Sequence, residues 1–284
     1  MSFIYKKPWL LLSCLLLAIT FAYHDAASSP VLEAVLADPQ YQVSDTIPSL
    51  SATAFGIYDL ESGELLVANN EELSLPIASV TKLATAAVLI SNYDLDSTTT
   101  IIASDLLAEG RSGNLQVGEE YTYRDLIFPL LLESSNDAAE IFTRLTDGSL
   151  VLEMNNLAEK LELTETKFTD SSGLSDSNIS SVNDLQHLLR HIYQETPLVL
   201  DITRLRNYVG PHRAWTNNSP ILQGDYRGGK HGYTEAANRT ALAIFEEEFA
   251  TKKRQLIYII LGSDNLSADT EILRNFVAES ITYQ

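Results

Sequence analysis

The sequence predicts an α+β (mixed α/β) fold with one antiparallel sheet formed by both chain ends, flanked by helices, and with a helical lobe inserted in the middle. Strand patterns occur near both ends of the chain, whereas the residues between them follow helical patterns. A third observation is a run that begins near Ser79 and would be apolar on almost every face of a helix, which is typical of a buried helix. A cleft between the sheet and the helical lobe is the natural place for a site.

The elements follow one another in a simple order. Residues 52–60 and 64–70 are expected to form two strands joined by a turn at Glu61–Gly63. The buried helix follows from Ser79, because Pro76 favours extended geometry in the residue before it. Further helices are expected at 124–133, 137–145, 152–161 and 182–193. Two strands, 240–247 and 255–262, and a helix, 270–281, complete the pattern.

The first 23 residues are predicted to be an export signal. Lys6 and Lys7 precede an uncharged run over residues 8–23, which is short for a bilayer span and suits a signal h-region. No clear small-x-small cleavage site follows, so a cleaved signal peptide and an uncleaved signal anchor both stay open. Residues 24–48 are expected to be a tether and residues 49–284 one folded domain. The domain is therefore expected outside the cytoplasmic membrane, in the cell envelope.

The length and composition of the chain exclude several classes of binding partner and of chemistry. The chain of 284 residues is long enough for a substantial core. A formal net charge of −19 argues against nucleic acid, which needs a basic face, and against adhesion to anionic lipid. Cys14 is the single cysteine and lies in the signal segment, so no disulfide or thiol chemistry is expected in the exported domain.

Ser79 and Lys82 are the strongest indication of function. Three residues apart on a helix, they share one face, with hydroxyl and amine within reach. Burial makes a charged lysine costly and lowers its pKa. A neutral amine beside a serine hydroxyl is what an activated nucleophile requires. The alternative is a plain helix start, with Ser79 as cap and a lysine that reaches solvent.

Ser134-Ser135-Asn136 lies between two apolar helical segments. Such a cluster is commonly a helix cap. The functional alternative is a hydroxyl that relays a proton and an amide that holds a substrate carbonyl.

Lys230-His231-Gly232 follows two glycines and leads towards a strand. The glycines would let a ligand backbone approach, and the lysine could hold a carboxylate as a point charge. Residues 224–230 also match the first part of a phosphate-loop pattern. His231 stands where that pattern needs Ser or Thr, and a strand rather than a helix is expected next, so the match is rejected.

Two other site types are disfavoured. His187 and His191 are four residues apart on an expected helix, but no Glu lies in the zincin position, so a helix face is the better interpretation. No Gly-x-Ser-x-Gly occurs, which argues against an α/β-hydrolase triad.

Ser-x-x-Lys, Ser-x-Asn and Lys-x-Gly, in this order, resemble the pattern of the penicillin-recognising serine enzymes. The flanking text, from about residue 50 to about residue 263, resembles the D-alanyl-D-alanine carboxypeptidases of low-molecular-mass penicillin-binding proteins. The segments that carry this likeness are AFGIYDLESGELLVANN, LPIASVTKLATA, LQVGEEYTYRDLIFPLLLESSNDAAE, DSSGLSDSNISSVNDL and GKHGYTEAANRTALA. The resemblance implies a β-lactamase/transpeptidase-like catalytic domain.

The resemblance also implies a reaction. The chain would remove the terminal D-alanine from peptidoglycan stem peptides through an acyl-enzyme, without metal or cofactor, and β-lactams would inhibit it covalently. Ser79 would be the nucleophile, Lys82 the general base, and Ser134 the proton relay to the leaving amine. The substrate-binding residues would be Asn136, Lys230, His231, Gly232 and Tyr233, with the backbone N–H groups of Ser79 and Tyr233 as oxyanion hole.

One residue departs from the family pattern. His231 stands where the family has Thr or Ser, whose hydroxyl contacts the substrate carboxylate. An imidazolium could donate to that carboxylate, and a neutral ring could do so in one tautomer. If the imidazolium is the binding form, affinity should weaken as pH rises through its pKa, ordinarily about 6.5. The ring could also narrow the cleft.

Two alternatives to the carboxypeptidase stay open, and a third is disfavoured. The chain could be a peptidoglycan endopeptidase that cuts cross-links, or a catalytically impaired peptidoglycan-binding homologue in which His231 is the lost element. A class A β-lactamase is disfavoured, because no E-P-E-L-N-type segment supplies a deacylating glutamate. The C-terminal β-domain and amphipathic anchor of many relatives are not found, so any membrane attachment is expected to come from residues 8–23.

Overall fold

The computed structural model describes residues 40–43, 47–110, 112–250 and 252–283. The expected signal segment, residues 1–23, and most of the expected tether lie outside these ranges. No helix among the described residues is long and apolar enough to cross a membrane.

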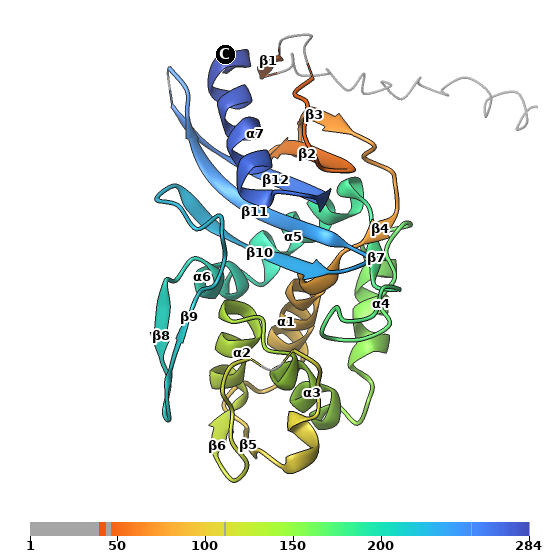
Figure 1. Ribbon diagram of the computed structural model, residues 1–284, viewed down its shortest axis with the longest axis vertical. Coiled ribbons are helices and arrows are strands. Elements are labelled where there is room, and N and C mark those ends of the chain that lie inside the picture. The colour runs from red at the N-terminus through yellow and green to blue at the C-terminus, as the bar shows by residue number, and fades with distance from the viewer. Residues whose placement is uncertain (1–39, 44–46, 111, 251, 284) are drawn as a thin grey trace, which may run out of the picture. The chain divides into compact units, whose positions relative to one another are not determined.

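A five-stranded antiparallel sheet is the centre of the fold, with the strand order β10-β11-β12-β2-β3 (Figure 1). Its strands are β2 (Ala54–Asp59), β3 (Leu65–Asn69), β10 (Tyr226–Thr234), β11 (Asn238–Glu248) and β12 (Lys253–Ser263). Because β2 pairs with β12, the sheet joins the two parts of the sequence that were expected to form it. The predicted sheet from both chain ends is therefore confirmed.

Alternation along the strands gives the sheet two apolar faces. On β12, Tyr258 packs in a cluster with Leu273 and Phe276 of α7 (Leu266–Ser280). Its neighbours Ile257 and Ile259 belong to a second cluster with the helical lobe. Successive strand residues point to opposite faces, so one strand serves both cores.

The helical lobe lies between the two halves of the sheet in sequence, as expected. It consists of α1 (Thr81–Asn92), α2 (Tyr123–Leu132), α3 (Asn136–Leu145), α4 (Leu150–Lys160), α5 (Val182–Glu195) and α6 (Leu198–Thr203). Residues 81–89 of α1 are all buried, which confirms the helix that was predicted to be apolar on nearly every face. Figure 1 shows α1 in the middle of the lobe, below the sheet.

Short elements complete the fold. They are the 3-10 turns η1 (Ala78–Val80) and η2 (Ala103–Leu106) and the ribbons β1 (Tyr41–Val43) with β13 (Ile281–Tyr283), β4 (Leu75–Pro76) with β7 (Ile179–Ser180), β5 (Thr98–Thr100) with β6 (Glu120–Thr122), and β8 (Asn207–Val209) with β9 (Ala214–Thr216). Strand β1 falls inside the segment expected to be a tether, so folded structure begins before residue 49.

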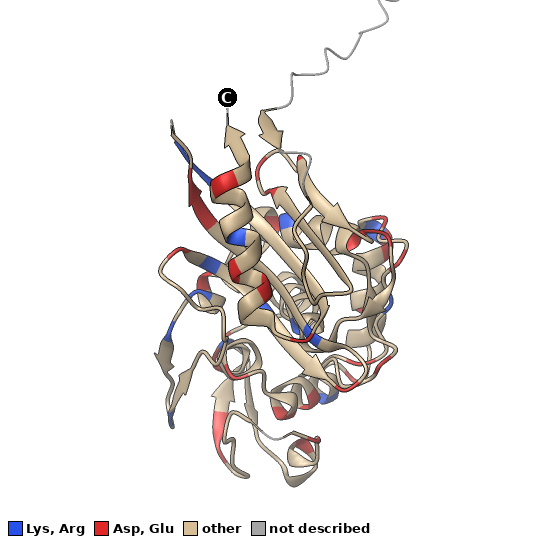
Figure 2. Cartoon of the chain, turned by 45° about the horizontal axis from the view of Figure 1, so that its top comes forward, with Lys and Arg blue, Asp and Glu red and all other residues tan. Residues whose placement is uncertain are grey.

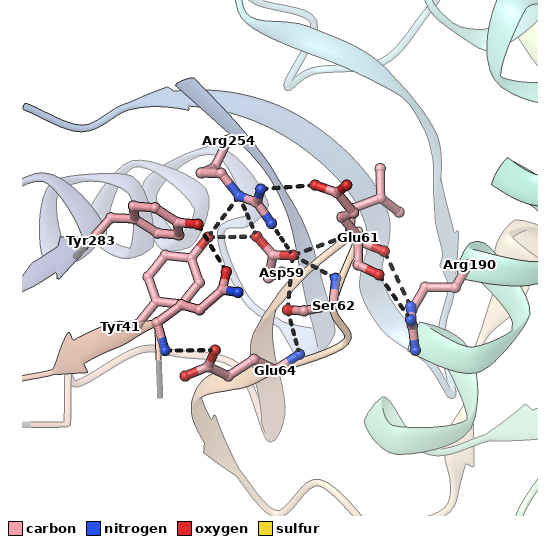
Figure 3. A network of polar contacts seen from close by, with 10 residues as sticks. Tyr41, Asp59, Glu61, Ser62, Glu64, Arg190, Arg254 and Tyr283 are labelled. Atoms are coloured by element: carbon pink, nitrogen blue, oxygen red, sulfur yellow. Dashed lines mark hydrogen bonds and ion pairs between the residues drawn. The ribbon is translucent and has the colours of Figure 1, made fainter. Parts of the chain in front are cut away.

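A polar network ties β1, β2 and β12 together (Figure 3). Asp59, with no exposed surface, accepts from both sides of the Arg254 guanidinium at 2.7 and 2.9 Å and from the Tyr41 hydroxyl at 2.5 Å. Ser62 donates to the same carboxylate through its N–H and its hydroxyl. A buried charge is stable only when it is paired and hydrogen-bonded, and this carboxylate is both.

Charges of both signs are interspersed on the surface. Figure 2 shows acidic and basic residues side by side on α7, where Arg274 forms ion pairs with Asp225 and Glu247. The acidic excess is thus partly organised into local pairs, which are worth little individually when exposed.

Candidate active site

A pocket of about 500 Å³ lies where η1, the α2–α3 turn and β10 meet, between the sheet and the helical lobe. Six of the eight predicted site residues line it, and Lys82 and Lys230 lie buried beside them. The lining residues are Ser79, Glu109, Gly110, Ser112, Glu133, Ser134, Asn136, Gly173, Leu174, His231, Gly232, Tyr233, Thr234 and Glu235. The pocket therefore lies between the sheet and the lobe, where the sequence predicted a cleft.

The nucleophile candidate sits just before the buried helix. Ser79 lies in η1, and α1 begins at Thr81, two residues later than the sequence pattern indicated. Ala78 has a left-handed backbone with φ of 47°, which is strained for a residue with a side chain. The turn places the Ser79 hydroxyl 3.0 Å from the Lys82 amine.

Lys82 is fully buried and has three hydrogen-bond partners. Its amine lies 2.8 Å from Oδ1 of Asn136, 2.5 Å from the Ser172 carbonyl and 3.0 Å from Oγ of Ser79. Asn136 donates through Nδ2 to the Glu109 carbonyl, so its Oδ1 is an acceptor. A neutral amine has two N–H groups, and the two carbonyl oxygens accept both. Its lone pair is left for the Ser79 hydroxyl, which then donates to Lys82.

The charge state agrees with this geometry. Burial lowers the pKa of Lys82 well below its ordinary value, and the charge of the nearby Lys230 lowers it further. The negative charge of Asp170 acts in the opposite direction and raises this pKa. Burial also lowers the pKa of Lys230, to about 7. The lowered pKa of Lys82 favours its neutral amine, the form that can accept a proton, whereas Lys230 is protonated in about half of the molecules at pH 7.

Asp170 builds the turn that supplies the Ser172 carbonyl. Its carboxylate accepts from the backbone N–H groups of Ser172, Gly173 and Ser175. Burial would raise the pKa of Asp170, but these donors lower it below the ordinary value. Gly173 has φ of 83° and packs so closely on Ala78 that a Cβ would overlap the Ala78 carbonyl oxygen. The turn thus supports both Lys82, the candidate base, and the strained peptide before Ser79, the candidate nucleophile.

Ser134 enters the same pocket, but its hydroxyl makes no hydrogen bond with any residue that the structure describes. Its backbone is left-handed, with φ of 61°. The neighbouring Ser135 is the residue that caps α3, by accepting from the Ala138 N–H. The cap and the candidate relay, which the sequence left as alternatives for one cluster, are therefore two different residues.

Lys230, His231 and Gly232 lie within β10 itself, rather than before a strand. Lys230 is 3% exposed and donates to the His231 carbonyl at 2.7 Å. A Cβ on Gly232 would lie 2.5 Å from the Ser79 nitrogen, so the glycine allows β10 to approach the nucleophile's backbone. Tyr233, 62% exposed, lies at the rim with Arg239 above its ring.

His231 differs from the expectation. Burial, followed by the charges of Lys230 and Lys82, lowers its pKa to about 3. The ring is therefore neutral from pH 5.5 upward, and the imidazolium expected to bind a carboxylate does not form there. The ordinary pKa applies to a solvated ring, whereas burial, with Lys230 and Lys82 close by, disfavours the charged form of this ring.

Sequence patterns missed several contributors. The carbonyl of Ser172 has no signature in the sequence, although the Asp-Ser-Ser-Gly turn that presents it is visible as a turn signal. The lining residues Glu109, Glu133, Leu174 and Glu235 had no signal of their own.

The sequence and the fold were compared with known proteins. The family model described as D-alanyl-D-alanine carboxypeptidase matches residues 41–265. The D-alanyl-D-alanine carboxypeptidase DacB2 of Mycobacterium tuberculosis is 33% identical over 215 residues, which cover 72% of this chain and 74% of that protein. A D-alanyl-D-alanine endopeptidase of Pseudomonas aeruginosa is also 33% identical, over 47% of this chain and 44% of its own length.

Solved structures show the same fold. The crystal structure of a D-alanyl-D-alanine carboxypeptidase from Mycobacterium tuberculosis matches with a TM-score of 0.77 and 28% identity, covering 87% of this chain and all of that one. Penicillin-binding protein D2 of Listeria monocytogenes, in its cefotaxime-bound form, matches with a TM-score of 0.72 and 25% identity over 82% of this chain and 98% of that one.

Proposed function

Because the chain belongs to the D-alanyl-D-alanine carboxypeptidase family of serine peptidases, we propose that it removes the terminal D-alanine from peptidoglycan stem peptides. The observation that carries the proposal is the Ser79–Lys82 pair, in which the hydroxyl lies 3.0 Å from a buried amine whose two other partners are carbonyl oxygens.

Acylation begins at this pair. Ser79 Oγ attacks the carbonyl carbon between the two D-alanines, and Lys82 takes the hydroxyl proton. The Ser79 N–H, which lies beside β10 at Gly232, and the N–H of Tyr233 would stabilise the oxyanion. Asn136 contributes by accepting an N–H of Lys82 and thereby orienting the base.

Expulsion of the leaving group needs a proton. Ser134 is assigned to pass the proton from Lys82 to the leaving amine, since its hydroxyl lines the pocket and is free to bind substrate. Water then attacks the acyl carbon, Ser79 leaves with a proton, and the shortened peptide is released. All steps use side chains and backbone of this chain.

Lys230 is assigned to the substrate carboxylate. It carries the available positive charge beside the pocket, while the neutral His231 ring can donate one N–H in one tautomer. A bound carboxylate would favour the charged form of Lys230, so substrate binding and protonation of Lys230 should support each other.

Family membership places the activity outside the cytoplasmic membrane, where peptidoglycan lies. Attachment through the apolar residues 8–23 is proposed from the sequence, and β-lactams are proposed to acylate Ser79. Support for the inhibitor comes from the similarity to the cefotaxime-bound penicillin-binding protein D2.

A second candidate activity, cleavage of D-alanyl cross-links, is favoured by the likeness to the Pseudomonas aeruginosa endopeptidase. Both reactions share the acyl-enzyme and differ in the leaving group. Digestion of a purified cross-linked dimer and of a pentapeptide, followed by mass spectrometry, would separate them.

Fluorescent penicillin tests the central assignment. Wild-type protein should be labelled covalently, and Ser79→Ala should not be labelled while keeping its fold. Mass spectrometry of the labelled protein should place the adduct on the peptide that contains Ser79. An adduct that persists in Ser79→Ala would show that another residue is the nucleophile.

A further inference from the structure

The pocket raises one question: what holds the Ser134 hydroxyl in position. A proton relay must be aimed at both the base and the leaving group, yet the Ser134 hydroxyl makes no hydrogen bond with the described residues. The position of the hydroxyl therefore depends on the Ser134 backbone and on the χ1 rotamers that this backbone allows. That backbone is left-handed, which costs of the order of 1–2 kcal/mol for a residue with a side chain and persists only when its surroundings hold it.

The residue before it provides the restraint. The Glu133 carboxylate accepts the Gly113 N–H through Oε2 and the Thr216 N–H through Oε1, both at 3.0 Å. The Glu133 carbonyl accepts from Asn218 Nδ2 at 3.2 Å. One residue thus joins the α2–α3 turn to the pocket loop at 112–114 and to the end of β9.

The loop at Gly113 is in turn fixed from two sides. The Gly113 carbonyl accepts from the buried Trp215 indole at 2.8 Å, and the Ser112 carbonyl accepts from the Ser135 hydroxyl at 2.7 Å. Gly113, one of the partners of the Glu133 carboxylate, is therefore itself held in place by hydrogen bonds to its own carbonyl and to that of Ser112.

We propose that Glu133 is a positioning residue that acts through Ser134, by fixing the backbone that aims the Ser134 hydroxyl at the leaving group. This inference rests on the proposed function. The restraint needs a carboxylate, because two N–H donors approach its two oxygens. A glutamine keeps one acceptor and turns an NH2 group towards the second donor.

The chemistry offers a selective test. In acylation the Ser79 Oγ–carbon bond forms, the carbon–nitrogen bond breaks, and the nitrogen must receive the proton that Ser79 gave up to Lys82. A matched thioester, in which sulfur replaces that nitrogen, expels a thiolate, which is a far weaker base than the nitrogen anion that an amide would expel without a proton. The thiolate leaves without needing the relayed proton. Loss of the relay should therefore slow the peptide much more than the thioester.

The experiment compares kcat/KM for an N-acyl-D-alanyl-D-alanine peptide and for its thioester analogue, since kcat/KM reports acylation for both. We expect Glu133→Gln to lower the value for the peptide about 10- to 100-fold, since a misplaced group of about 1 Å can cost about 100-fold. We expect the thioester to change less than about threefold, because the relay contributes little there.

Asp125→Asn is the matched control. Asp125 lies at the other end of α2, where its carboxylate also accepts a backbone N–H, from Thr122, and contacts Tyr208 of β8. The Asp125→Asn variant should lose an amount of thermal stability comparable to that lost by Glu133→Gln. It should leave the ratio of kcat/KM between the peptide and the thioester unchanged. A purely structural role of Glu133 would give the same result, with both substrates reduced alike, and would overturn the inference.

A double variant gives an independent test. If Glu133 acts through Ser134, adding Glu133→Gln to Ser134→Ala should cost no further activity towards the peptide. A full additional loss would mean that Glu133 contacts the substrate itself or supports another group, and would also overturn the inference. If wild type cleaves neither substrate, the proposed function fails, whereas equal losses in a cleaving enzyme refute the role of Glu133 alone.

Discussion

The pH dependence of turnover is the sharpest prediction of this site, and it concerns Lys230 rather than His231. The substrate carboxylate stays ionised above pH 5.5, because an α-carboxyl has a pKa of about 3.5. Lys230 must be protonated to attract it, so activity should fall as pH rises through the pKa of Lys230, about 7. Lys82 must be neutral to accept a proton, so activity should fall as pH falls through its lowered pKa.

The size of the alkaline effect follows from the protonated fraction. With a pKa of about 7, Lys230 is half protonated at pH 7 and about 1% protonated at pH 9. We therefore expect kcat/KM for a D-alanyl-D-alanine peptide to fall about 50-fold between these two pH values. The value to measure is kcat/KM, since it reports the groups of the free enzyme.

Two variants identify the group whose titration causes the fall of kcat/KM between pH 7 and pH 9. The His231→Thr variant should still show this fall, because the imidazole ring of the wild type is already neutral from pH 7 to pH 9. Lys230→Arg should lose it, because arginine remains charged, even if the larger side chain lowers the plateau. A wild-type profile that is flat from pH 7 to 9 would refute the argument. Loss of this fall in His231→Thr would mean that His231 is the titrating group.

Three further predictions follow from the contacts. Lys82→Arg should lose nearly all turnover, because arginine supplies charge but no base; near-normal acylation by penicillin in a rapid-mixing assay would exclude Lys82 as the base. Gly173→Ala should lower stability by about 1–3 kcal/mol or more and slow acylation, since the added Cβ meets the Ala78 carbonyl at a positive φ; an unchanged melting temperature would contradict that packing. Asp59→Ala should cost about 3–5 kcal/mol in urea unfolding, because it removes the buried partner of Arg254 and leaves the exposed Glu61 as the remaining ion pair; a loss below 1 kcal/mol, about the worth of an exposed pair, would refute that account.

The sequence predicts contacts well when spacing determines them. Ser79 and Lys82 are three residues apart on one helical turn, so their meeting follows from helix geometry. The contact between Lys82 and Asn136 spans 54 residues and depends on how α1 and α3 pack, which periodicity does not describe. The resemblance to a known family supplied that pairing of motifs, and the structure supplied the distance.

Other features of the structure could not be predicted from the sequence, for identifiable physical reasons. Strand β10 contains Gly228, Gly229 and Gly232, and glycine weakens the alternating pattern by which a strand is recognised. Backbone carbonyls such as that of Ser172 act in the site without any side-chain signal. The pKa of His231 depends on burial and on two lysines that lie close in space, so a reference value could not predict it.

The pairing of β2 with β12 also constrains when the chain can fold. The Asp59–Arg254 pair joins residues 195 positions apart, so the centre of the sheet depends on a contact that closes a very long loop. Such contacts form late, since the entropy of closure must be met first. During synthesis, a chain interrupted before residue 253 lacks the strand to which β2 and β11 both pair. If the chain is exported amino terminus first, as proposed, it would therefore complete this sheet only after nearly all of it had crossed the membrane, on the side where peptidoglycan lies.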